Sequence, residues 1–141
     1  MKRGFTLVEI MIVVAIVAIL ITLAVPGLLR SKVIANETAA LGNLRTINNA
    51  CQLYHNNEEK YPASLDVLAQ TQPPYLDSIL ASGQKQSYQF IYTLVSNDQF
   101  TVNANPTSLG LLRGRYFYLD ESGVIRFKND GPAGPNDEIY R

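Results

Sequence analysis

The chain has 141 residues, which is enough for one domain with a modest core and too short for two. Its 12 Lys and Arg balance its 12 Asp and Glu, so the net charge indicates no specific attraction to nucleic acid. Cys51 is the single cysteine, which excludes a domain held together by internal disulfides. With one histidine as well, no set of nucleophile, base and orienting residue can be named, so we expect neither an enzyme nor a cofactor.

The N-terminal segment is apolar over the length of a membrane span. From Phe5 to Val25 it has 21 residues, about 30 Å as a helix. Its polar side chains are those of Thr6, Glu9 and Thr22. Lys2 and Arg3 precede it, so the positive-inside rule places the N-terminus in the cytoplasm and the rest of the chain across the membrane.

Three interpretations of this segment compete. An ordinary cleaved signal peptide has an apolar stretch of about 7–15 residues and a small-x-small site; Thr22-Leu23-Ala24 supplies such a site, but the apolar run is too long. A plain membrane anchor fits the length. Glu9 is out of place in both, because a carboxylate inside a span costs about 2.5–3.5 kcal/mol at mid-membrane and less near the end.

The third interpretation rests on the motif KRGFTLVE, from Lys2 to Glu9. This motif resembles the leader and cleavage site of type IV prepilins and of the related pseudopilins of type II secretion. The resemblance implies that a prepilin peptidase cuts between Gly4 and Phe5 and then methylates the new amino group of Phe5. It also implies that Glu9 pairs with the N-terminal amine of a neighbouring subunit, which would offset the cost of desolvating the carboxylate. Glycine suits the cleavage point, because a residue without a side chain lets a protease approach the backbone.

Pro26, followed by Gly27, stands where this family commonly carries a proline, so the resemblance implies a role for Pro26 in subunit assembly. A proline inside a helix removes one hydrogen bond and kinks or locally melts the helix. The same proline would also mark the exit from the membrane, and the two roles are compatible.

Residues 30–57 are predicted to continue the helix as an amphipathic half. Its apolar stripe consists of Leu41, Leu44, Ile47, Cys51 and Tyr54. The helix is expected to stop at Asn56-Asn57, which makes it about 80 Å long. Because the domain is too small to bury residues 5–29, this first half must lie in lipid or among copies of itself, as in an open helical filament.

Residues 58–141 are predicted to form a connection, a sheet and a tail. Ser64 is a candidate N-cap for a short helix from Leu65 to Ala69, and Tyr75 to Leu80 fits a second short helix or a turn. Four strands are then predicted from the alternation of side chains, at 88–95, 99–104, 115–120 and 124–128.

The strands are expected to form antiparallel hairpins. Asn105-Pro106 should end the second strand, and Glu121 to Gly123 should form a turn in which Gly123 takes positive φ. The last two strands are expected to share one face through Phe117, Leu119, Ile125 and Phe127. The predicted fold class is α+β and pilin-like, with one long N-terminal helix packed on a four-stranded antiparallel sheet.

The tail from Asn129 to Glu138 is rich in turn residues. Major pseudopilins hold calcium in an acidic C-terminal loop, so the resemblance makes Asp130, Asn136, Asp137 and Glu138 candidate ligands. Their spacing matches no calcium-binding pattern, and we favour a solvated, irregular tail. Cys51 and His55 share a helix face but are too few for a metal site, so we expect a core cysteine beside a surface histidine.

These features predict a filament subunit in four parts: a cleaved leader (1–4), an apolar half-helix (5–29), an amphipathic half-helix (30–57) and a domain (58–141). We expect a type IV pilus subunit, major or minor, with a type II secretion pseudopilin as the alternative and a membrane-anchored periplasmic binding module as a third class. A single cysteine cannot close the disulfide loop of the best-known major pilins.

The expected partners are other pilins in a homo- or hetero-oligomeric filament, the prepilin peptidase, an inner-membrane assembly platform and, before assembly, lipid. We expect a single-pass protein of the bacterial inner membrane with its C-terminal domain in the periplasm. It would then enter an extracellular pilus or a periplasmic pseudopilus.

Overall fold

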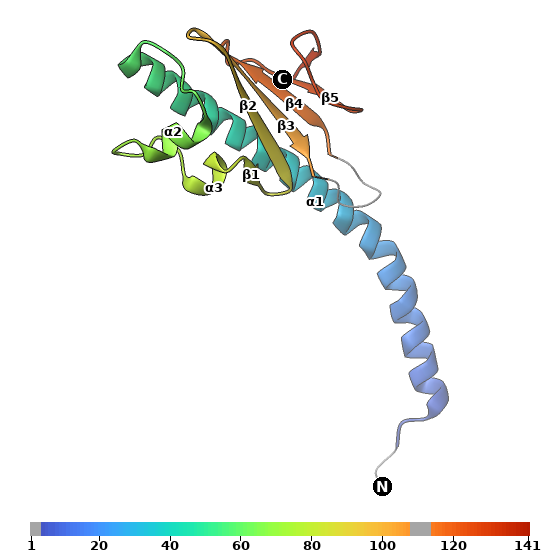
Figure 1. Ribbon diagram of the computed structural model, residues 1–141. Helices are drawn as coiled ribbons and strands as arrows, with labels where there is room; N and C mark the ends of the chain where they lie inside the picture. Colours follow the sequence, from blue (N-terminus) through green and yellow to red (C-terminus); the bar gives the residue numbers. More distant parts are fainter. Residues whose placement is uncertain (1–3, 108–113) are drawn as a thin grey trace.

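Helix α1 dominates the fold and runs from Leu7 to Glu58 (Figure 1). The computed structural model describes residues 4–107 and 114–141. At 52 residues, α1 is about 78 Å long, close to the predicted length. Thr6 is its N-cap, and Glu59 ends it in a left-handed conformation with φ of 56°. The predicted long helix is confirmed, and it stops one residue after the Asn56-Asn57 signal.

Pro26 lies inside α1, and the residues on both sides of it remain helical. The free half of the helix is curved rather than straight (Figure 1). Proline lacks the N–H that would bond one turn back, and curvature is a usual way to accommodate that loss. The structure therefore shows no melted segment at this proline, and the helix that contains it is curved.

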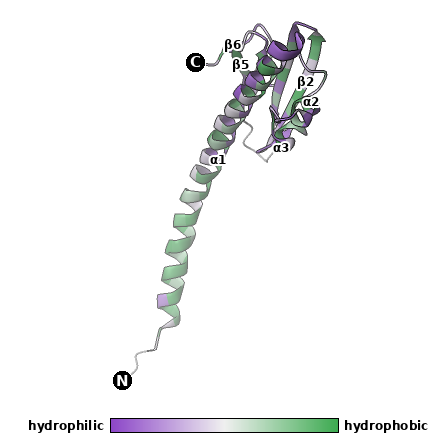
Figure 2. Ribbon diagram, turned by 90° about the vertical axis from the view of Figure 1, so that its left-hand side faces the viewer, coloured by the Kyte–Doolittle hydropathy of each residue, from purple (hydrophilic) through white to green (hydrophobic). Residues whose placement is uncertain are grey.

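The two halves of α1 differ in polarity and in burial. The first half is coloured mainly as hydrophobic, apart from a hydrophilic segment near its N-terminal end, whereas hydrophilic residues are frequent along the second half (Figure 2). The predicted stripe is confirmed: Leu41, Leu44, Ile47 and Cys51 are buried, and Tyr54 packs against the core while partly exposed. The first half buries no residue against its own domain.

The sheet has six antiparallel strands in the order of the chain. The four predicted strands are β2 (Tyr88–Ser96), β3 (Gln99–Pro106), β4 (Tyr116–Asp120) and β5 (Ile125–Lys128). Two further strands, β1 (Gln84–Lys85) and β6 (Glu138–Ile139), form the edges. The predicted fold, a long helix packed on an antiparallel sheet, is confirmed, and the described sheet has two more strands than the four predicted. The two were missed because a strand of two residues has no alternation from which it could be recognised.

Two details of the predicted sheet have different outcomes. The expected end of β3 before Asn105-Pro106 is wrong, since β3 includes both residues and Pro106 pairs with Tyr88 at its last position. A strand end tolerates proline because no further ladder bond is required there. The hairpin from β4 to β5 is confirmed, with Gly123 at φ of 75° and with Phe117 opposite Phe127 and Leu119 opposite Ile125.

The core forms between the stripe of α1 and one face of the sheet. The largest fully buried strand side chains on this face are Tyr88, Phe100, Val102, Phe117 and Leu119. Tyr61 packs edge-on against Phe100, with ring centroids 4.6 Å apart, and so joins the end of the helical region to the sheet. Burial of apolar surface from both layers is what holds this half of α1 to the domain.

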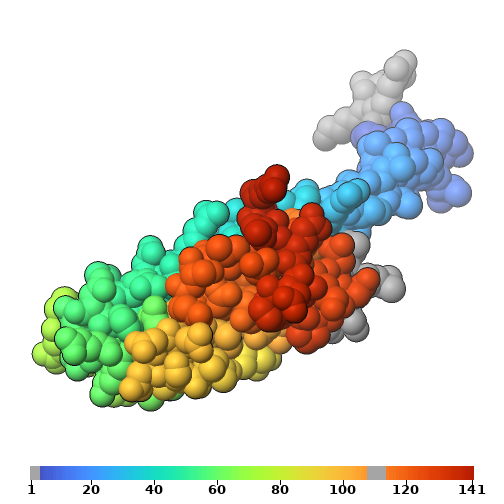
Figure 3. Space-filling model, turned by 90° about the horizontal axis from the view of Figure 1, so that it is seen from above, coloured from blue at the N-terminus to red at the C-terminus, as the bar shows by residue number. Residues whose placement is uncertain are grey.

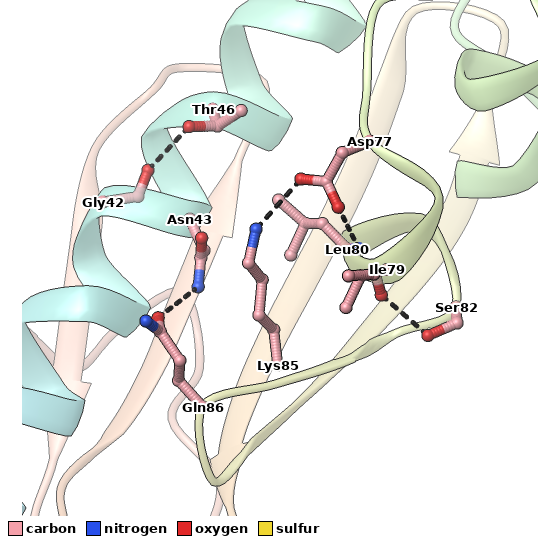
Figure 4. A network of polar contacts seen from close by, with 9 residues as sticks. All are labelled: Gly42, Asn43, Thr46, Asp77, Ile79, Leu80, Ser82, Lys85 and Gln86. Atoms are coloured by element: carbon pink, nitrogen blue, oxygen red, sulfur yellow. Dashed lines mark hydrogen bonds and ion pairs between the residues drawn. The ribbon is translucent and has the colours of Figure 1, made fainter.

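The connection between α1 and β2 contains two short helices, α2 (Leu65–Gln70) and α3 (Ser78–Ala81). The expected α2 is present, although Ser64 caps it without a side-chain hydrogen bond, and the segment expected as a short helix or a turn contains α3, which begins three residues later than Tyr75. Asp77 caps α3 by accepting from the Leu80 N–H at 2.9 Å, and its other oxygen binds Lys85 at 2.9 Å (Figure 4). These bonds hold α3 and β1 together beside α1.

The tail is more ordered than predicted. Seen from above, the red C-terminal segment lies over the orange strands (Figure 3). Asn103 Nδ2 donates to the Ala133 carbonyl at 2.8 Å, and Ala133 is 4% exposed. Arg126 donates to the Asp137 carbonyl at 3.2 Å. The tail is irregular from residue 129 to 137, as expected, but Ala133 is buried rather than solvated, because the tail covers part of the outer face of the sheet.

Replacing Leu44 by alanine is expected to lower the free energy of unfolding of the domain by about 2–5 kcal/mol, because Leu44 is 0% exposed between helix and sheet. The full chain in detergent micelles would be unfolded with denaturant and followed by near-UV circular dichroism. Leu53→Ala is the matched control, since Leu53 lies on the same helix and is 52% exposed. Equal losses in the two variants would contradict the packing described above.

Candidate assembly site

The predicted cleavage point lies in an exposed segment ahead of α1. Gly4, Phe5 and Thr6 precede the first helical residue, and the Phe5 side chain is 78% exposed. A Cβ added at Gly4 would meet nothing within 4 Å. Among the described residues, a side chain at this position would therefore meet no steric obstacle.

Thr6 and Glu9 form a reciprocal capping box at the start of α1. The Thr6 hydroxyl oxygen accepts from the Glu9 N–H at 3.2 Å, and Glu9 Oε2 accepts from the Thr6 N–H at 3.3 Å. The Glu9 carboxylate also lies where the helix dipole favours a negative charge. In a single subunit the carboxylate is thus held at the N-terminal end of α1.

The apolar half of α1 has no partner within the described chain. Of the helices in the described residues, α1 alone is long and apolar enough to cross a membrane. Its large side chains are exposed throughout, from Leu7 at 76% to Leu29 at 49%. Such a continuous apolar surface marks a contact with lipid or protein.

A second polar cluster joins α1 to the sheet. Glu37 is 8% exposed and is the one buried charged residue in the described part of the chain. Its Oε1 accepts from the Arg115 backbone N–H at 2.8 Å, and its Oε2 accepts from Arg115 Nε and Nη2 at 3.1 and 2.9 Å. The hydrogen bonds that Arg115 donates to Glu37 raise the pKa of Arg115, so this guanidinium stays charged.

Sequence analysis missed this pair, although one signal pointed to it. Glu37 precedes Leu41 by four residues, so it continues the buried stripe of α1 toward the N-terminus. A charged residue on such a stripe needs a partner. The partner could not be named, because Arg115 lies 78 residues further along the chain.

Cys51 and His55 lie in different surroundings. Cys51 is 0% exposed, and burial raises the pKa of its thiol to about 12. His55 Nε2 lies 3.3 Å from an Asp98 carboxylate oxygen, and its ring packs on Tyr61 with centroids 4.4 Å apart. The expected core cysteine is confirmed.

The tail residues proposed as calcium ligands are held by other contacts or left apart. Asp137 Oδ2 accepts from the Gly134 N–H at 2.8 Å. Asp130 and Glu138 are exposed, the latter within β6. Across residues 4–107 and 114–141, no three His, Cys, Asp or Glu side chains gather closely enough to hold a metal ion.

Comparison with known proteins agrees with the motif and the fold. The family described as "Prokaryotic N-terminal methylation motif" matches residues 1–25. The type II secretion system core protein G of Escherichia coli K12 is 33% identical over 88 residues, 62% of this chain and 61% of that protein. The protein of the same name from Aeromonas hydrophila is 29% identical over 144 aligned positions, 98% of this chain and 90% of that protein.

A pilus protein is also similar. The type IV major pilin protein PilA of Myxococcus xanthus is 36% identical over 60 residues, which cover 43% of this chain and 27% of PilA. No solved structure gives a significant match. The N-terminal methylation motif, the long helix packed on an antiparallel sheet and these relatives together show that the chain is similar to type IV pilins and type II secretion pseudopilins.

Proposed function

We propose that this chain is a pseudopilin, a structural subunit of the filament of a type II protein secretion system. The relatives favour this function over the type IV pilus that we placed first from the sequence. Core protein G of Aeromonas hydrophila aligns over 98% of this chain, whereas PilA aligns over 43%. The single cysteine also fits a subunit without the disulfide loop of the best-known major pilins.

One observation supports assembly as the function above all others: half of α1 is an apolar rod that its own domain leaves exposed. Before assembly this half lies in the inner membrane, with the domain in the periplasm. During assembly it moves from lipid into a bundle of identical helices, and little apolar surface meets water in that exchange. The inner-membrane assembly platform would guide this transfer.

Different residues of the N-terminal segment serve leader cleavage, methylation and contact between subunits. Prepilin peptidase cuts between Gly4 and Phe5, removing Lys2 and Arg3, and methylates Phe5. The side-chain charge then changes from 12 − 12 to 10 − 12, or −2. The new amine of one subunit pairs with the Glu9 carboxylate of its neighbour, and Pro26, inside the curved half of α1, helps neighbouring helices fit along the filament.

A type IV pilus subunit is the second candidate, favoured by the 36% identity to PilA. Deleting the gene distinguishes the two. We expect loss of folded exoproteins from the culture medium, with surface fibres unchanged and secretion restored by the wild-type gene. Long surface fibres built from this chain at native expression, together with normal secretion in the deletion strain, would reject the pseudopilus.

Mass spectrometry of the protein recovered from membranes and filaments tests the processing step itself. We expect the mature chain to begin at Phe5 with a methylated amino group. Assembled material in which the chain retains Met1 to Gly4 would contradict both the pseudopilus and the pilus function.

A further inference from the structure

Glu37 lies at the point where α1 leaves the domain. Toward the N-terminus, Ile34 is still 56% exposed, and residues 4–32 are exposed throughout. Toward the C-terminus, Ala40 and Leu41 begin the packed stripe at 1% and 6% exposed. Counted from the N-terminus, Glu37 is therefore the first residue of α1 whose side chain is buried against the domain.

Arg115 binds this carboxylate from the sheet side and is itself held in place. It immediately precedes β4, and its carbonyl accepts from the Tyr88 hydroxyl at 2.8 Å. Its guanidinium carbon lies 5.2 Å from the ring centroid of Phe127 and 5.3 Å from that of Tyr140. Contacts from β2, β5 and the C-terminal segment thus fix the position of the cation that binds α1.

The backbone at this point also approaches closely. A Cβ at Gly114 would lie 2.5 Å from the Tyr88 hydroxyl oxygen, so the chain entering β4 passes where no side chain fits. The bond from the Arg115 N–H to Glu37 adds a backbone contact to the two from the guanidinium. Three hydrogen bonds with fixed directions restrain rotation of α1 relative to the domain. Apolar contacts along the stripe restrain this rotation less, because burial alone has no preferred direction.

We propose that the contact between Glu37 and Arg115 is a clamp that sets the direction in which the protruding half of α1 leaves the domain, and that incorporation into the filament requires this direction. The inference rests on the proposed function as a filament subunit.

A small change in the direction of α1 at Glu37 becomes a large displacement at its N-terminal end. Glu37 lies about 45 Å from Leu7 along the helix, so a rotation of about 10° at the clamp would move the N-terminal end by about 8 Å. That displacement exceeds the ~5.4 Å pitch of one helical turn. Glu9 would then meet the wrong part of its neighbour, while the domain would still contact the adjacent domains.

Spin labels on the full chain in detergent micelles test the clamp without a filament. One label replaces Ser31 on the protruding half and the other replaces Thr93 on the sheet; both positions are exposed. Cys51 is buried and stays unlabelled. Double electron–electron resonance should give a narrow distance distribution for the wild type and a clearly broader or shifted one for Glu37→Gln and Arg115→Lys.

Incorporation is measured in the same variants in cells. We expect leader cleavage to be normal and filament yield to fall about tenfold, in line with the loss of a charge-assisted hydrogen bond. Glu58→Gln and Arg45→Lys are matched controls, because both residues are exposed on the same helix and belong to no ion pair among the described residues. Both controls should match the wild type.

Three results would overturn the clamp. The first is an unchanged distance distribution in Glu37→Gln and Arg115→Lys. The second is a changed distribution with wild-type filament yield. The third is the same broadening in Leu44→Ala below its melting temperature, which would indicate general loss of stability. A wild-type chain that forms no filament would reject the proposed function, and the distance measurement would still test the clamp.

Discussion

Gly4→Ala is expected to leave the precursor uncut and in the membrane, with filament formation abolished. The fold gives no reason for this loss, because a methyl group at Gly4 would meet nothing within 4 Å and the segment is exposed. The effect would therefore arise at the peptidase, where a side chain at the cleaved bond keeps the backbone away from the catalytic groups. Intact mass separates the precursor from a chain that begins at Phe5.

Gly27→Ala is the matched control for that variant. A Cβ at Gly27 also meets nothing within 4 Å, and this position lies well inside α1. Its precursor should be cut normally, and alanine should favour the helix slightly. Normal cleavage of Gly4→Ala would show that the assigned site is wrong.

The failure to cut has a second consequence. An uncut chain keeps the charges of Lys2 and Arg3 at its N-terminus and has an amide at Phe5 in place of a free amine. The carboxylate of a neighbouring Glu9 would then have no partner inside an apolar bundle. Cleavage of the peptide bond between Gly4 and Phe5 is therefore needed to create the amine that pairs with Glu9 during assembly.

The helix and the main strands could be predicted because their side chains repeat with a fixed period. The stripe from Leu41 to Tyr54 recurs every three or four residues, and Phe100, Val102 and Ala104 alternate in β3. The edge strands β1 and β6 are too short for any period, and they form because longer neighbours present unpaired backbone groups.

The residues of the candidate site also differ in whether they could be predicted from the sequence. Gly4, Phe5 and Glu9 stand in one continuous motif, so they could be named from the sequence. The reciprocal bonds of Thr6 and Glu9 follow a local signature that the sequence contained and that we overlooked. The pair of Glu37 and Arg115 depends on the start of β4 lying next to α1, which no local pattern encodes.

The cap and the assembly role of Glu9 can be separated by two substitutions. Glutamine at position 9 can still accept from the Thr6 N–H, so Glu9→Gln keeps the capping box but loses the charge. Glu9→Ala loses both. Loss of the cap alone costs about 0.5–2 kcal/mol of helix stability, whereas a charge left without its partner in an apolar bundle costs about 3–5 kcal/mol.

We therefore expect Glu9→Gln and Glu9→Ala to be cleaved normally and to enter filaments more than about a hundredfold less well than the wild type, as about 3 kcal/mol implies. The fraction of mature chain in sheared filaments, relative to the membrane, measures this. Thr6→Ala removes the hydroxyl side of the cap and leaves the carboxylate, so it should lower incorporation by much less. Wild-type yield in Glu9→Gln would refute the charge pairing and leave the capping box as the role of this glutamate. Equal losses in Glu9→Gln and Thr6→Ala would mean that the start of the helix, rather than the charge, limits assembly.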